Sequence, residues 1–304
     1  MKKLKYILIV IPLWFFVETV SAQQAPFYSQ YMFNDYLVNP GVAGTYNYFQ
    51  VRVNSRIQWS GINDSPRTMS IAGYGPFKER DMGYGGYIYY DKTGPESKMF
   101  LGGTYAYNIA INDAIRISGG LTVGIMQYSL DGTLMYFDDD IIDPVMSNAV
   151  ENKIIPDASL GFYVYASQFY GGIAVHQLFG NKYYDHPDIE GADGESKLVQ
   201  NFNISGGYFL MLNRDFALSP SALIKYSLPN QFQFDISAKV TYQRMVWGAL
   251  SYRYLDAISI MLGYEYENKV KLGISYDITT SEIRRYTNVG TIEIMLGYKF
   301  NKIK

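Results

Sequence analysis

Apolar and polar residues alternate with a period of two along much of the chain. In the stretch 231–242 every second residue is apolar or aromatic and the residues between are polar. The apolar set is Phe232, Phe234, Ile236, Ala238, Val240 and Tyr242. Successive side chains of a β-strand point to opposite faces, so this pattern predicts a strand with one apolar and one polar face. The apolar face must contact either a second sheet or lipid.

The same alternation recurs and predicts about 14 strands. We expect them at 49–59, 68–76, 82–90, 98–109, 114–128, 157–166, 169–178, 201–212, 216–228, 231–242, 245–254, 257–266, 270–278 and 291–300. Lengths of roughly 9–12 residues suit tilted strands that cross a bilayer.

The connections between these strands differ in length in a regular way. Six tight polar connections (77–81, 111–113, 167–168, 213–215, 243–244 and 267–269) alternate with connections that are longer on average, including 129–156 and 179–200. Membrane barrels have short periplasmic turns and longer outside loops, and an even number of strands puts both termini on the periplasmic side. The pattern therefore predicts an all-β, transmembrane antiparallel β-barrel.

A soluble β-sandwich is the alternative, because its strands alternate as well. A sandwich would need a second sheet over each apolar face and would not sort its connections by length. A closed barrel also removes the unpaired edges of a large sheet. Pro220 lies inside a predicted strand, and because proline cannot donate to a ladder we expect a bulge or strand end there.

The chain divides into three predicted regions. Residues 1–22 resemble a signal peptide, with Lys2, Lys3 and Lys5 before an apolar run and Val20-Ser21-Ala22 as the cleavage site. Residues 49–304 form the barrel. Residues 23–48 are aromatic-rich without alternation, so we expect them to enter the lumen or cap its periplasmic mouth; a loose periplasmic tail is the alternative. The candidate lumen residues are Phe27, Tyr28, Tyr31, Phe33, Tyr36, Arg52, Arg56, Asp235 and Lys239.

Composition supports a membrane barrel and excludes several other classes. The chain has 30 Tyr and 28 Gly, and tyrosine is typical of the aromatic girdles at membrane interfaces. The net charge is -2 without a basic tract, which argues against a nucleic-acid partner. No cysteine is present, so disulfides, thiolate metal sites and cysteine nucleophiles are excluded.

Three stretches carry a resemblance to a known family. "FYSQYMFNDYLVNPGVAG" (27–44), "RIQWSGINDSPRTMSIAGYGPF" (56–77) and "KLGISYDITTSEIRRYTNVGTIEIMLGYKF" (271–300) resemble the PorP/SprF family of Bacteroidetes outer-membrane proteins. The resemblance implies an outer-membrane barrel associated with type IX secretion and gliding motility. It implies a partner that is either periplasmic secretion machinery or a surface adhesin with a type B C-terminal domain. Residues 301–304 depart from the aromatic ending of many barrels.

Two long connections are the predicted partner-binding surface, because they combine apolar and acidic residues. The candidates are Tyr136, Phe137, Asp138, Asp139, Asp140, Ile141, Ile142, Tyr183 and Tyr184. Alternatively, these loops pack on each other and close the barrel. Their carboxylates leave calcium binding open, but a solvated acidic loop is the preferred interpretation.

Little in the sequence indicates catalysis. His176 lies on an inward-facing position, but no Ser or Asp can be paired with it from sequence, so we interpret it as a histidine lining the lumen rather than part of a lipid hydrolase. We expect no enzyme activity and no cofactor. The inward charges have both signs, which suits a plugged barrel or a water-filled one. A passive porin for small solutes therefore remains the alternative function.

Overall fold

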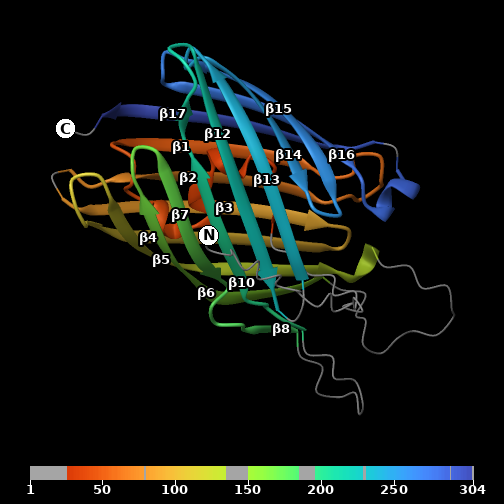
Figure 1. Ribbon diagram of the computed structural model, residues 1–304. Coiled ribbons are helices and arrows are strands. Elements are labelled where there is room, and N and C mark those ends of the chain that lie inside the picture. Colours follow the sequence, from red (N-terminus) through yellow and green to blue (C-terminus); the bar gives the residue numbers. More distant parts are fainter. Residues whose placement is uncertain are drawn as a thin grey trace, which may run out of the picture.

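The strands of the chain close into one antiparallel barrel (Figure 1). The computed structural model describes residues 26–78, 80–134, 150–184, 196–228, 231–287 and 289–302. The barrel strands are β1 (Tyr48–Ile57), β2 (Arg67–Pro76), β3 (Met82–Thr93), β4 (Glu96–Ala110), β5 (Arg116–Asp131), β6 (Val150–Tyr165), β7 (Phe169–His176), β10 (Asn201–Tyr208), β11 (Leu210–Met211), β12 (Phe216–Ser227), β13 (Gln231–Tyr242), β14 (Val246–Arg253), β15 (Ala257–Tyr266), β16 (Val270–Thr279) and β17 (Thr291–Lys302).

Barrel strands that follow one another in the chain pair with each other, and the pairing of β1 with β17 closes the barrel. β10 pairs with β7 on one side and with β12 on the other. β10 and β11 are two parts of one strand interrupted at Phe209, so the fifteen segments form fourteen strands. The predicted barrel of about 14 strands is confirmed.

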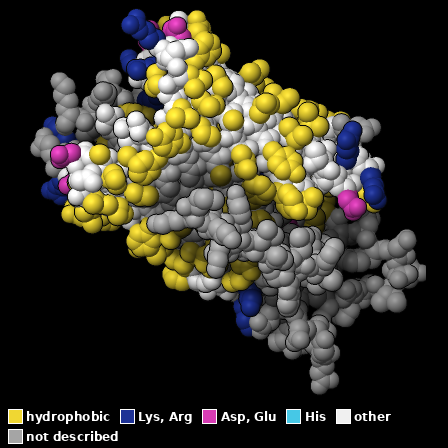
Figure 2. Space-filling view, viewed as in Figure 1, with side chains coloured by type: hydrophobic (Ala, Val, Ile, Leu, Met, Phe, Trp, Pro, Cys, Tyr) yellow, Lys and Arg dark blue, Asp and Glu magenta, His cyan; other side chains and the backbone are white. Residues whose placement is uncertain are grey.

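The alternation of side chains sorts each strand into a lipid face and a lumen face. In β1, Gln50, Arg52, Asn54 and Arg56 are buried inside the barrel, whereas the residues between them are more exposed. In β13, Asp235 is 1% exposed and its neighbour Ile236 is 52% exposed. Hydrophobic side chains cover the barrel wall, and the charged side chains in view gather near the strand ends (Figure 2). This is the distribution that lipid around a barrel requires.

The connections lie at two ends that differ as predicted. The short-turn end holds 77–81, 111–115, 166–168, 212–215, 243–245 and 267–269, together with the start of β1 and the end of β17. The long-loop end holds the other connections. It includes the short helices η3 (Gly132–Leu134) and η4 (Glu282–Arg285) and the separate ribbon of β8 (Lys182–Tyr184) with β9 (Ser196–Lys197).

Several strand ends differ from the sequence-based prediction. β6 begins at Val150 rather than 157, because 150–156 continue to pair with β5 as far as Asp131. Ile155 is the one buried residue of this extension, and 150–154 show no alternation of buried and exposed side chains. β1 ends at Ile57 rather than 59, because Trp59 has a left-handed φ of 48°.

The N-terminal segment, residues 26–47, lies inside the barrel (Figure 1). It contains three short helices, η1 (Tyr31–Phe33), α1 (Asp35–Val38) and η2 (Pro40–Val42). The carbonyl oxygen of Pro26 accepts a hydrogen bond from Lys225, near the long-loop end of β12. Gly44 contacts Gly83, which follows a short turn.

The segment therefore crosses the lumen from one end to the other. The barrel strands begin and end at the short-turn end, as expected for an even number of strands. β1 starts at that end, but the first described residues lie toward the opposite one.

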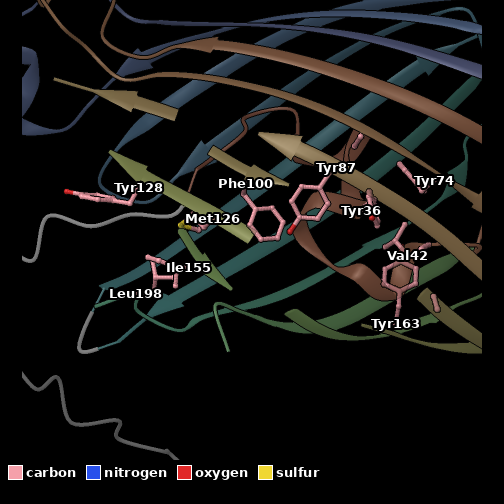
Figure 3. Close-up of a cluster of buried hydrophobic side chains, with 13 residues drawn as sticks. Tyr36, Val42, Tyr74, Tyr87, Phe100, Met126, Tyr128, Ile155, Tyr163 and Leu198 are labelled. Carbon is pink, nitrogen blue, oxygen red and sulfur yellow. The ribbon is translucent and has the colours of Figure 1, made fainter. Parts of the chain in front are cut away.

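Aromatic side chains fill the space between this segment and the wall (Figure 3). Tyr36 stacks on Tyr74 of β2 with ring centroids 4.5 Å apart, and the cluster continues through Tyr87, Phe100 and Met126. On the other side, Phe33 packs on Trp247 of β14 at 4.2 Å. Burying each such side chain stabilises the packed state by about 1.5–3 kcal/mol. The core of this protein is thus the lumen of its barrel.

Candidate functional site in the barrel lumen

A cluster of ionised side chains lines the inner wall at the long-loop half of the barrel. Arg56 of β1 forms ion pairs with Asp277 of β16 at 2.9 Å and with Glu293 of β17 at 3.2 Å. Arg253 of β14 lies 3.3 Å from the same Asp277 and 3.5 Å from Asp235. All five side chains are at most 3% exposed. Charges buried this deeply persist only when paired and hydrogen-bonded.

Ser29 of the N-terminal segment lies at the centre of this cluster. Its hydroxyl donates to Asp277 at 2.7 Å and accepts from Arg56 at 2.7 Å and Arg253 at 2.9 Å. Its backbone N–H donates to Glu293 at 2.7 Å, and the N–H of Gln30 donates to the same carboxylate at 3.1 Å. The segment therefore completes the hydrogen bonding of charges that come from four strands.

Two phenylalanines of the segment contact the cations of the wall. The Arg253 guanidinium lies 3.7 Å from the centroid of the Phe27 ring, and Lys225 lies 4.8 Å from it. The Phe33 ring has Lys239 at 4.7 Å and Lys271 at 4.9 Å. Cations at this distance are attracted by the ring quadrupole, more strongly where water is excluded.

The middle of the segment makes a second polar contact. The Asp35 carboxylate accepts hydrogen bonds from Tyr46 at 2.6 Å and Tyr74 at 3.0 Å. One hydroxyl therefore donates to each oxygen of this carboxylate. The Tyr36 hydroxyl contacts Thr104 of β4 at 2.5 Å. The segment is thus bound to the strands on both sides of the lumen.

Asn39 and its neighbours attach the segment to β6, β7 and β10. The Asn39 side chain donates to the carbonyl oxygens of Phe162 at 2.9 Å and Ile173 at 3.2 Å. The Val38 carbonyl oxygen lies 2.9 Å from Nε2 of His176 and accepts from Asn203 at 3.0 Å. These bonds satisfy polar groups of the segment and of the wall inside the barrel.

Glycines in the wall allow the backbone of the segment to approach. A Cβ at Gly120 of β5 would lie 2.3 Å from the carbonyl oxygen of Pro40, and one at Gly83 of β3 would lie 2.3 Å from that of Ala43. Any other residue would have to displace the segment at these points. The wall and the segment are therefore complementary in shape as well as in charge.

His176 serves this packing rather than a catalytic arrangement in the structure. Its Nδ1 lies 3.1 Å from the hydroxyl of Ser159, which the sequence did not single out. The other ring nitrogen contacts the Val38 carbonyl, and Ser159 is 2% exposed. Both ring nitrogens therefore contact groups of the wall and the N-terminal segment, and His176 and Ser159 line a small cavity of about 70 Å³.

The structure brings most of the candidate lumen residues into one region. Phe27, Tyr28, Tyr31, Phe33 and Tyr36 all pack against the inner wall, and Arg52, Arg56, Asp235 and Lys239 all project inward. Arg52 donates to Gln50 at 2.6 Å and does not join the cluster around Ser29.

The sequence analysis missed Ser29, Asp35, Asn39 and Asp277. A polar residue within an aromatic stretch that does not alternate was the available signal for the first three. For Asp277, the signal was its inward position in a predicted strand.

The candidate partner-binding residues cannot be placed in the same way. Residues 136–142, and the signal peptide at 1–22, lie outside the described residues. Tyr183 and Tyr184 belong to β8 by their backbone. Within the described ranges, no group of three or more potential ligands could hold a metal ion, and no helix is long and apolar enough to cross a membrane. The acidic residues considered for calcium lie mostly outside these ranges.

Comparison with known proteins identifies a family and a fold. A family model described as "Type IX secretion system membrane protein PorP/SprF" matches residues 20–298. A search of curated proteins finds no match.

Solved structures that resemble the chain are membrane barrels. The toluene transporter TbuX of Ralstonia pickettii is 10% identical with a TM-score of 0.53, and the match covers 88% of this chain and 92% of TbuX. The CymD monoaromatic hydrocarbon channel is 10% identical with a TM-score of 0.50, over 91% of this chain and 94% of CymD. At this identity the likeness concerns the fold alone.

Proposed function

Because the chain belongs to the PorP/SprF family of type IX secretion system membrane proteins, we propose that it is a non-enzymatic partner of that system in the outer membrane. In this role it holds or helps to export a surface adhesin with a type B C-terminal domain, or it docks periplasmic machinery. The long-loop end faces outward, and the short-turn end faces the periplasm.

The observation that carries this proposal is the filled lumen. Residues 26–47 cross the barrel and bind its wall through the ion cluster at Ser29, the aromatic cluster at Tyr36 and the carbonyl contacts at Asn39. A barrel that conducts solutes needs an open path lined by solvated groups. Here the path is occupied by protein, so the ends of the barrel are the surfaces left for a protein partner.

We place the partner on the long-loop end, on the connections that contain residues 136–142 and 183–184. Those stretches combine aromatic, aliphatic and acidic side chains, and aromatic residues are enriched at protein interfaces. The lengths of β5 and β6 support this choice, because both ends of the first of these connections lie at the long-loop end.

The test is gentle detergent purification of the tagged protein from its native outer membrane, followed by mass spectrometry. We expect a large secreted protein or type IX components at near-stoichiometric amounts. Replacing 136–142 by a Gly-Ser linker should release an adhesin, whereas the same change at the short turn 213–215 should not.

A lone barrel from every preparation would contradict the proposal and favour a passive porin. If the 136–142 variant retains the adhesin, the partner site lies elsewhere on the protein. Loss of periplasmic components on changing 213–215 would instead indicate the docking role.

A further inference from the structure

The barrel wall contains a gap between β10–β11 and β12. Gly207 pairs with Ser221 and Leu210 pairs with Leu218, but the two residues between them on each strand are unpaired across this boundary. One of these is Pro220, which has no N–H to donate. The N–H of Phe209 turns away to the carbonyl oxygen of Gln168 at 2.6 Å. Among the described strands, this interruption of the pairing therefore leaves few backbone hydrogen-bonding groups without a partner.

Side-chain alternation is also lost at the gap. Residues 208–212 are all exposed, so this stretch directs few side chains into the lumen. Gly206 and Gly207 precede it, and they add no bulk on the inner side. The wall is therefore incompletely paired at this point, and the ring of Tyr170 packs against Gly207 on its inner side.

A cavity of about 200 Å³ lies directly behind the gap. It is lined by Phe209 and Pro220 of the gap, by Tyr46 of the N-terminal segment, and by Tyr165, Tyr170 and Lys239 of the wall. Phe209 lines the cavity and is also 44% exposed. Its side chain therefore lies between the cavity and the accessible surface of the protein.

The size and lining of this cavity indicate what it can hold. A cavity of roughly 150 Å³ with apolar walls is large enough for benzene. Here the walls are largely aromatic, and ring pairs prefer the offset and edge-on geometries that several tyrosines can offer. Tyr170 already packs on Phe209 at 5.9 Å and on Tyr163 at 5.7 Å.

Asp35 and Lys239 are the charged residues that line the cavity. Among the described residues, no carboxylate lies within ion-pair distance of Lys239, and Glu265 is bound instead by Lys271 at 3.0 Å and by Lys299. The Asp35 carboxylate is already satisfied by two tyrosine hydroxyls. A ligand here meets an unpaired ammonium beside aromatic walls.

We propose that this cavity binds a small single-ring aromatic carboxylate, which enters through the gap past Phe209. The ring packs between the tyrosines, and the carboxylate pairs with Lys239. This site is independent of the proposed role in secretion.

Benzoate is the probe, added to the purified full-length protein in detergent and followed by ligand-observed NMR. We expect saturable binding, and at least tenfold weaker binding of cyclohexanecarboxylate, which has the same charge and no aromatic ring. Ser219 also lines the cavity. Ser219→Phe should reduce benzoate affinity at least tenfold by filling it, and Lys239→Met should do so by removing the charge.

A matched control is Ala222→Phe, which adds the same ring to the exposed face of the same strand. It should leave benzoate affinity unchanged. Phe209→Ala should raise the exchange rate of benzoate several-fold, whereas Tyr208→Ala, at an exposed residue that does not line the cavity, should not.

No saturable binding of benzoate, or equal binding by the Ser219→Phe variant, would overturn the proposal. Equal affinity for cyclohexanecarboxylate would show a site for anions without selection for a ring, and would overturn the ligand class. An exchange rate unaffected by Phe209→Ala would overturn the route of entry.

Discussion

Ser29 connects the N-terminal segment to four strands through a single hydroxyl and a single N–H. The hydroxyl is shared by Arg56, Arg253 and Asp277, which lie 27, 224 and 248 positions away in the chain. Leaving a buried polar group without its partner costs about 1–3 kcal/mol, and more for a charged one. This residue therefore has more influence on the position of the segment than its size suggests.

We predict that Ser29→Ala loosens the segment. The substitution removes one acceptor from two arginines and one donor from a carboxylate, so we expect destabilisation of about 1–3 kcal/mol. The temperature at which the folded barrel loses its characteristic gel mobility measures this destabilisation, and it should be lower for the variant. Ser205→Ala is the control, since no side-chain hydrogen bond is seen for this half-buried serine among the described residues. Equal effects of both substitutions would contradict a special role for Ser29.

A second prediction concerns the close approach at Gly120. Gly120→Ala places a Cβ where the Pro40 carbonyl oxygen now lies, at 2.3 Å, so the segment must shift. Proteolysis within residues 26–47 should become faster. Gly103→Ala is the matched control, because a Cβ there meets no atom within 4 Å. If both variants resist protease as the native protein does, the segment does not depend on this contact.

At the scale of elements, the strands divide the barrel into two ends with different loops. The short-turn end contains tight connections such as 243–245, and the long-loop end contains 254–256 among its connections. The chain has no cysteine, so a single introduced cysteine reports the position of one end.

We predict that Leu255→Cys reacts with a membrane-impermeant maleimide on intact cells. Leu255 is 63% exposed and lies at the long-loop end. Arg244→Cys, exposed at the opposite end, should react only after the outer membrane is permeabilised. The reverse labelling pattern would show that the barrel is inserted in the opposite sense, and would place the predicted partner loops in the periplasm.

The strands could be predicted from sequence because lipid on one side and packed lumen on the other impose a period of two. The prediction failed where that condition ends. In the extension 150–156 only Ile155 is buried, and in the stretch 208–212 every residue is exposed. Pro220 signalled an irregularity correctly, and the structure shows it as missing pairing on one side of β12.

The path of the N-terminal segment could not be predicted in the same way. Its aromatic residues indicated a need for burial, but its partners come from strands throughout the barrel. The Ser29 contact with Glu293 spans 264 positions, and no local pattern encodes such a pairing. Which charges of the wall meet the segment, and which end of the barrel it reaches, follow only from the closed structure.

At the scale of the whole molecule, the barrel and its N-terminal segment form one packed unit. The segment completes an aromatic core to which the wall contributes Tyr74, Tyr87 and Phe100, and the wall supplies the partners for its polar groups. Such an arrangement stabilises a closed barrel whose two ends present different surfaces. From this architecture we infer that the protein binds components of the secretion system and does not act as a pore for solutes.

Conductance across a planar bilayer tests this account most directly. The purified native protein should show no sustained channel current, because residues 26–47 fill its lumen. Gly120→Ala should conduct intermittently, and Gly103→Ala should remain silent, since only the first displaces the segment. Steady current through the native barrel, unchanged in both variants, would contradict a closed lumen and favour the porin function.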